Sequence, residues 1–104
     1  MKRFPVDVAI VAYNEFVTPV EPSRNEVEML IPVIHDTLGA IGLEQSGIDF
    51  TVSGSADYLQ GQPFAFVAAV DALGAWPPIR ESHLEMDGAF ALYEALMLMA
   101  HGEA

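Results

Sequence analysis

The sequence contains no cysteine, and only 4 of its residues are lysine or arginine. Without cysteine the chain has no disulfide, no thiolate nucleophile and no cysteine-ligated metal, so the composition does not fix a redox compartment. Its 15 acidic residues give a net charge of −11. This charge cannot neutralise a phosphate backbone or attract anionic headgroups, which argues against nucleic-acid binding and against binding to an anionic membrane surface.

Long apolar runs are also missing. The longest nearly continuous one, residues 89–100, contains Glu94 and is too short to cross a bilayer, so we expect no membrane span. Near the start, two basic residues precede an apolar stretch, as in a signal peptide. That stretch lacks a small-residue cleavage site and is broken at Pro5, Asp7 and Asn14. We therefore predict a strand there, and a cytoplasmic protein.

What is present favours a folded chain. Hydrophobic residues make up 52% of the 104 positions, which excludes a disordered polyelectrolyte despite the net charge. The length suits one domain, residues 1–104, with one core. No internal repeat or low-complexity segment interrupts it.

The apolar pattern predicts three strands and three helices. Residues 6–11 are rich in β-branched side chains and apolar on both faces apart from Asp7, as in a central strand of a covered sheet. Further short strands are expected at 48–55 and 79–84, and the last helix over 86–101. Between the later strands, Pro63 suits a first helical turn, with Phe64, Val67, Ala68 and Leu73 able to pack. The order β-α-β-α-β-α predicts a layered α/β fold with parallel strands.

The first helix has a clear start signal. Ser23 is followed three residues later by Glu26, which is the capping-box spacing, and Gly39 and Gly42 can end the helix. Pro32 lies inside it, so we expect a kink or a late start. Its apolar residues form one stripe: Val27, Leu30, Ile31, Ile34, Leu38 and Ile41. Such a stripe predicts an amphipathic helix lying on a sheet.

The last helix is apolar on almost every side. One face carries Ala89, Phe90, Tyr93, Leu96, Met97 and Ala100, and Leu92, Leu98 and Met99 lie off it. A chain of this size cannot cover such a helix completely, so the pattern predicts a homo-oligomer or a partner protein. The alternative is that the methionines are core filler and that some apolar surface is ordinary.

Three residues before this helix could carry chemistry. His83, Glu85 and Asp87 alternate, so on a strand they would face one way and could bind a metal through nitrogen and oxygen. Glu85 or His83 could instead act as a general base beside apolar neighbours. Asp87 also lies where the helix begins, and the helix dipole stabilises an acid there without any metal.

Other polar groups favour structural roles. The stretch SGSADYLQGQ could present backbone amides to a phosphate, but it matches no nucleotide-binding fingerprint, and a turn capped by Asp57 or Ser55 is favoured. Ser53 and Ser55 lack the pattern of a hydrolase nucleophile. His35 and His101 lie in predicted helices and are interpreted as structural.

Three stretches together carry a family resemblance: VAIVAYNEF, NEVEMLIPVIHDTLGAIGL and SGSADYLQGQPFAFVAAVDALGAWPPIRESHLEMDGAFALYEA. They resemble the N-terminal part of the thiolase superfamily, in the branch of lipid-transfer proteins and sterol-carrier-protein-type acetyl-CoA acetyltransferases. The resemblance spans essentially the whole chain. It implies an incomplete thiolase-like fold in which the last helix is a central, buried one and the preceding strand lies at a dimer interface.

The resemblance also implies a site. It puts the nucleophilic cysteine of thiolases at about Glu85, with Met86 and Asp87 close by, so this chain lacks the acyl-enzyme nucleophile. Some steroid side-chain-degrading members that also lack it are similar to retro-aldol lyases acting on acyl-CoA with a partner that carries an OB-type domain. Their other catalytic residues lie in later parts of the fold. We therefore expect an acyl-CoA-processing protein without a bound cofactor, inactive by itself, or else a non-catalytic association module.

Overall fold

The computed structural model describes residues 5–61, 63, 66–74 and 80–104. Its helices are α1 (Glu26–Ala40), α2 (Asp57–Gln60), α3 (Phe66–Leu73) and α4 (Gly88–Ala100), and a 3₁₀ turn, η1, covers Gln45–Gly47. Its strands are β1 (Thr51–Gly54) and β2 (Glu81–Leu84). Helix and strand alternate from β1 onward, so the coarse α/β class predicted from the sequence is confirmed.

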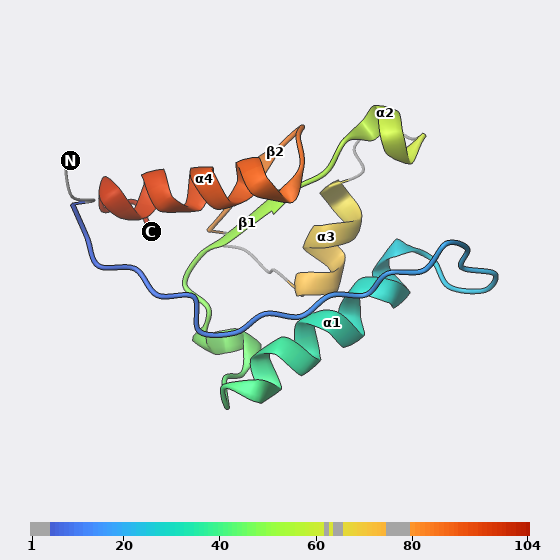
Figure 1. Cartoon of the computed structure of the whole chain (residues 1–104), viewed down its shortest axis with the longest axis horizontal. Helices are drawn as coiled ribbons and strands as arrows, with labels where there is room; N and C mark the ends of the chain where they lie inside the picture. Colours follow the sequence, from blue (N-terminus) through green and yellow to red (C-terminus); the bar gives the residue numbers. More distant parts are fainter. Residues whose placement is uncertain (1–4, 62, 64–65, 75–79) are drawn as a thin grey trace.

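The two strands form a parallel pair. Thr51 lies opposite Glu81 and Gly54 opposite Leu84, so both strands begin and end at the same level. Figure 1 shows α4 on one side of the strands and α3 with α1 on the other. The unit from β1 through α3 to β2 is therefore a βαβ crossover with parallel strands.

The predicted first strand, residues 6–11, is wrong in this structure. Residues 5–25 contain no regular secondary structure, and the segment runs past α1 as an extended chain (Figure 1). The side chains of Ile10 and Val11 are 79% and 69% exposed. A β-branched run becomes a strand only where another strand and a packed face receive it, and here the segment has neither. The described residues therefore show a two-stranded sheet instead of the predicted three strands.

The first helix begins two residues later than predicted. Asn25, not Ser23, is its N-cap: the Asn25 side chain accepts the Glu28 amide at 2.9 Å, and the Glu28 carboxylate accepts the Asn25 amide at 3.3 Å. This reciprocal pair is a capping box, shifted from the predicted one. At the other end Gly42 has φ +67°, and the Leu43 amide reaches the Leu38 carbonyl at 3.0 Å. The predicted stop at the glycines is confirmed, in the form of a Schellman motif.

The apolar stripe of α1 is half-buried along its whole length, from Val27 to Ile41, while Glu28 and Asp36 are exposed. Helix α1 packs mainly against α3, which in turn touches β1, so the prediction that α1 lies directly on the sheet is wrong. Pro32 lies within α1, which begins before it and continues through it, so of the two predicted alternatives the late start is wrong and the kink stays a prediction.

The second predicted helix begins at Phe66, later than the predicted first turn at Pro63, and a separate short helix, α2, precedes it. α2 ends at Gly61, whose φ of +73° suits a left-handed cap, and Pro63 lies in a turn before α3 instead of in a first helical turn. Ala72 is 6% exposed and Val67 is 50% exposed. The predicted packing of Phe64 and Ala68 falls outside the described positions, as does the part of the predicted third strand at residue 79.

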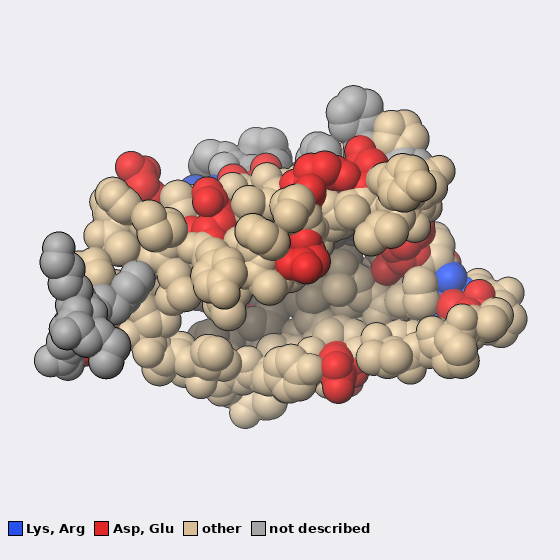
Figure 2. Space-filling model, turned by 45° about the horizontal axis from the view of Figure 1, so that its top comes forward, with Lys and Arg blue, Asp and Glu red and all other residues tan. Residues whose placement is uncertain are grey.

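The last helix matches its predicted range closely and is poorly covered. Ala91, 7% exposed, packs toward β1, but five large apolar side chains of α4 are exposed by 36% to 62%: Phe90, Leu92, Tyr93, Met97 and Met99. Ala72 and Ala91 are the two buried hydrophobic residues among the described positions. Figure 2 shows acidic side chains scattered among residues of other kinds, with little lysine or arginine, on the face that includes this helix. No helix in the described parts of the chain has the length and hydropathy to span a membrane.

Candidate functional site at the strand ends

The carboxyl ends of β1 and β2 meet the start of α4. The Ser55 amide donates to the Leu84 carbonyl at 3.2 Å, which keeps the strands together one residue beyond β1. Gly54 lies against the backbone of Asp87, and a Cβ at this position would come within 2.8 Å of the Asp87 carbonyl carbon. Open parallel sheets bind ligands in crevices at this edge, so this junction is the first place to look for a site.

A hollow of about 460 Å³ opens at this junction. Its walls come from the residues that follow β1, from α2 and from the turn between β2 and α4, and they include Leu59, Glu85, Met86 and Asp87. Two of the three candidate residues from the sequence, Glu85 and Asp87, thus border one cavity. Its lining residues include two carboxylates and no lysine or arginine.

A chain of polar contacts leads from the sheet to this hollow. Ser53 and His83 are direct partners in the strand register, and Ser53 Oγ lies 3.0 Å from His83 Nδ1. On the other side of the ring, His83 Nε2 lies 3.7 Å from Glu85 Oε2. The second carboxylate oxygen of Glu85 accepts the amide of Asp57 at the start of α2. The amide at the start of α2 therefore orients Glu85, and the His83 ring on β2 lies beside it.

Burial decreases along this chain of contacts. The His83 side chain is 13% exposed, whereas that of Glu85 is 54% exposed and reaches the hollow. A half-exposed carboxylate with one oxygen on an amide and the other beside an imidazole keeps lone pairs open to a ligand. The arrangement can accept a hydrogen bond or a proton from a group bound in the hollow.

Asp87 is turned away from this pair. Its carboxylate caps α4 by accepting the Ala89 amide at 3.0 Å and the Phe90 amide at 3.3 Å. The prediction that an acid is stabilised at this helix start is confirmed, and the capped amides are not open to a ligand anion. The three alternating residues therefore do not converge. Over the described ranges, no group of three histidine, aspartate or glutamate side chains could hold a metal ion.

The sequence did not assign Ser53 to this site. Ser53 lies in β1, within the strand predicted at 48–55, but its partnership with His83 depends on the strand register. The expected cap at Ser55 or Asp57 is also wrong, because the N-cap of α2 is Ala56 and no side chain caps it. The Asp57 amide binds Glu85.

The other two histidines, His35 and His101, do not line this hollow. His101 follows α4, and its Nδ1 lies 2.8 Å from the Met97 carbonyl, a contact that suits a helix C-terminus. His35 is exposed on α1. Both placements agree with the structural roles expected from the sequence.

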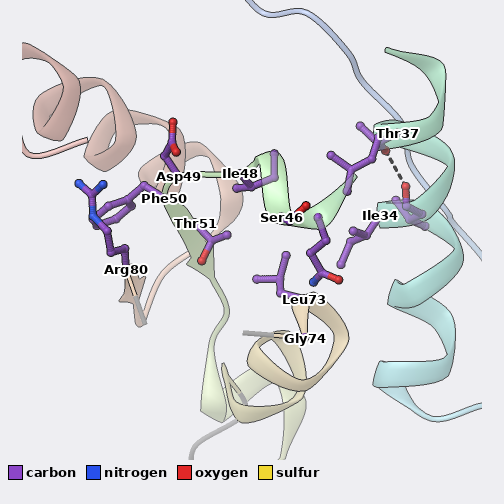
Figure 3. Close-up of a pocket in the computed structure, with 13 residues that line it drawn as sticks. Ile34, Thr37, Ser46, Ile48, Asp49, Phe50, Thr51, Leu73, Gly74 and Arg80 are labelled. Atoms are coloured by element: carbon purple, nitrogen blue, oxygen red, sulfur yellow. Dashed lines mark hydrogen bonds between the residues drawn. The ribbon is translucent and has the colours of Figure 1, made fainter. Parts of the chain in front are cut away.

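A larger hollow, of about 820 Å³, lies at the opposite end of the strands. Figure 3 shows it between α1, η1 and the end of α3, with Ile34, Ile48 and Leu73 among the apolar side chains. Arg80 stands at its edge, with its guanidinium 5.6 Å from the centre of the Phe50 ring and bonded to the Glu103 carbonyl at 2.7 Å. The cavity is mainly the incompletely filled space between α1 and the sheet.

Comparison of the chain with protein-family models, with curated proteins and with solved structures finds no match.

Proposed function

We propose that this chain is the N-terminal part of a thiolase-like acyl-CoA-processing protein, of the acyltransferase or steroid side-chain retro-aldol lyase type, and that it is inactive alone. The observation that carries the proposal is the uncovered helix α4. With Phe90, Tyr93 and Met97 each about half exposed, the helix forgoes about half of the free energy that full burial of those side chains would supply. Exposed apolar surface of this kind marks a site where other protein binds.

The second support is the position of the candidate site. The family resemblance places the thiolase nucleophile at about Glu85, and Glu85 borders the hollow at the strand ends, just before α4. The chain has no cysteine, so it cannot form a thioester with the acyl group. Acid or base chemistry remains available to Glu85 and His83, which favours cleavage of a carbon–carbon bond over thiolysis.

The proposal extends to partners and location. We propose a cytoplasmic protein that binds a thiolase-fold subunit, identical or different, or a partner with an OB-type domain, and that takes acyl-CoA as substrate only in the complete assembly. The chain's acidic surface supplies few cations for the phosphates of coenzyme A. Those cations would come from the rest of the assembly.

The first test is the mass of the native polypeptide in its source cells, detected with an antibody against the 54–63 loop. A band several times heavier than the 11.3 kDa of this chain is expected. The isolated chain is then assayed for thiolysis and for aldol cleavage of acyl-CoA, and no turnover is expected. Robust turnover by the isolated chain would contradict the proposal that it is inactive alone.

A second function is favoured by the same helix. The exposed apolar face of α4 also suits a non-catalytic association module, which would bury the helix against a second copy or another subunit. Sedimentation of the purified chain tests this alternative. It predicts a stable oligomer that Tyr93→Glu on α4 dissociates, whereas Tyr58→Glu, at a side chain 93% exposed on α2, leaves it intact. A stable micromolar monomer with no dye-binding apolar surface contradicts it.

A further inference from the structure

We propose that Glu85 is the proton-accepting residue of the hollow at the strand ends, and that its ligand is a neutral, hydroxyl-bearing group on an apolar body. The binding step stands on the geometry of this chain alone. The reaction assigned to it rests on the proposed function.

One hydrogen bond orients the carboxylate of Glu85. One of its oxygens accepts the Asp57 amide at the start of α2, and the other lies 3.7 Å from His83 Nε2 on β2. The second distance is too long for a hydrogen bond, so the imidazole is a nearby polar neighbour of the carboxylate. Fixed acceptors are what a site needs, because no further reorganisation is required when the ligand arrives.

His83 is a positioning residue for this carboxylate. Ser53 Oγ lies 3.0 Å from His83 Nδ1. When the serine hydroxyl donates to Nδ1, the neutral imidazole must carry its proton on Nε2, the nitrogen that faces Glu85. The strand register sets the Ser53–His83 contact, since the two residues are direct partners. With the serine as the donor, the Nε2 hydrogen lies on the side of the ring that faces Glu85.

The charges of the hollow select its ligand. Glu85 and Asp87 both line it and none of its lining residues is basic, so an anionic ligand would be repelled. Of the two arginines in the described ranges, Arg24 pairs with Glu21 at 2.9 Å and Arg80 lies just before the opposite end of β2. The hollow is therefore not a place for phosphates. The side chains of Leu59 and Met86 supply apolar surface beside the carboxylate.

In the complete enzyme this geometry suits retro-aldol cleavage of a β-hydroxyacyl thioester. The hydroxyl proton passes to the Glu85 carboxylate, and the oxygen forms a carbonyl as the bond between the α and β carbons breaks. The electron pair of that bond goes to the α carbon as a thioester enolate, which then takes up a proton. The step needs no oxidant and no thiol nucleophile, in keeping with a chain that has no cysteine.

The test uses the full 104-residue chain and three small probes, followed by amide NMR. The probes are 1-methylcyclohexanol, its O-methyl ether, which lacks the hydroxyl hydrogen, and 1-methylcyclohexanecarboxylate, an anion. We expect the alcohol to shift the Asp57 and Glu85 amide signals in a saturable way, and the ether and the anion to bind at least fivefold more weakly, since a hydrogen bond to a charged acceptor exceeds a neutral one.

Matched variants locate the effect. Glu85→Gln keeps the shape but removes the charge, and should weaken alcohol binding by roughly fivefold to tenfold. Glu81→Gln, at the start of β2, should leave it unchanged, and thermal melts check that both variants fold. Ser53→Ala should change the tautomer ratio of His83, read from its imidazole nitrogen shifts, and should also weaken alcohol binding, whereas loss of a purely structural contact would leave alcohol binding unchanged. Equal binding of alcohol and ether, equal binding by Glu85→Gln, or no binding of the alcohol overturns the proposal.

These outcomes are separable from the proposed function. Alcohol binding that depends on Glu85 in a chain whose native mass is 11.3 kDa would keep the site and reject the larger enzyme. A heavier native protein whose Glu85→Gln variant retains full aldol cleavage would support the larger enzyme and reject the role of Glu85.

Discussion

Ser53 and His83 face each other across the parallel strands, and Ser53 Oγ lies 3.0 Å from His83 Nδ1. This is the side-chain contact that joins the two strands on the side of the sheet that leads to Glu85. It links the stability of the sheet to the geometry of the candidate site.

Removing the hydroxyl should weaken the sheet modestly. We expect Ser53→Ala to lower the free energy of unfolding by about 1 kcal/mol, the usual net contribution of one hydrogen bond in a partly buried position. Ser46→Ala, at an exposed position of η1, should change it by less than about 0.5 kcal/mol. Urea titration followed by circular dichroism measures both. Equal effects would mean that the contact contributes no stability.

The close approach of β1 and α4 depends on Gly54. Because an added Cβ would come within 2.8 Å of the Asp87 carbonyl carbon, Gly54→Ala must push the helix away from the strand. We expect it to cost about 1–3 kcal/mol, as other overpacked sites do. Gly39→Ala is the matched control: nothing lies within 4 Å of its added methyl, and it lies inside α1. That change should stabilise the chain by roughly 0.4–1 kcal/mol, and a loss of stability there would contradict the assigned helix.

The start of α1 gives a third prediction. Asn25→Ala removes the side chain that accepts the Glu28 amide and should cost about 1 kcal/mol. Ser23→Ala should cost only a few tenths of that amount, because the Ser23 hydroxyl contacts Glu21 at 3.3 Å in an exposed turn. Thermal melts of the two variants, with helix content read at the same time, decide between the caps. A larger cost for Ser23→Ala would restore the cap predicted from the sequence.

Acid should release one local contact. The hydrogen bond from Arg24 lowers the pKa of Glu21 from 4.5 to about 2. A carboxyl whose pKa is lower in the folded state stabilises the fold above its unfolded pKa. That contribution is lost as the pH falls from 4.5 toward 2. Comparing the unfolding free energy of the native chain with that of Glu21→Gln across this range should show curves that converge in acid. A constant offset would mean that the pair does not form.

How much of the fold could be predicted from the sequence depended on whether local or long-range contacts decide each element. The helix 86–101 and the strand near 48–55 were predicted correctly in place, since their apolar patterns and glycine stops are local signals. Residues 6–11 were not, because a strand needs a neighbouring strand, and Ile10 and Val11 remain exposed. The cap at Asn25 was missed because Ser23 and Asn25 both have a glutamate three residues later.

The candidate site was predictable in part for the same reason. Alternation along the chain brings His83 and Glu85 together, and their side chains lie 3.7 Å apart. It does not bring in Asp87, because β2 ends at Leu84 and the next turn directs Asp87 to the helix. Ser53 belongs with them only through the pairing of two strands 30 residues apart, which no local pattern specifies.

That separation also sets an order of events during synthesis. The Ser53–His83 contact spans 30 residues, so β1 leaves the ribosome roughly 2–6 s before β2, at about 5–20 residues per second. During this interval β1 has no strand to pair with, while α1 can already form from its own sequence signals. The parallel pair is therefore a late, slow contact in the folding of this chain, and the helix that closes over it, α4, emerges only after both strands.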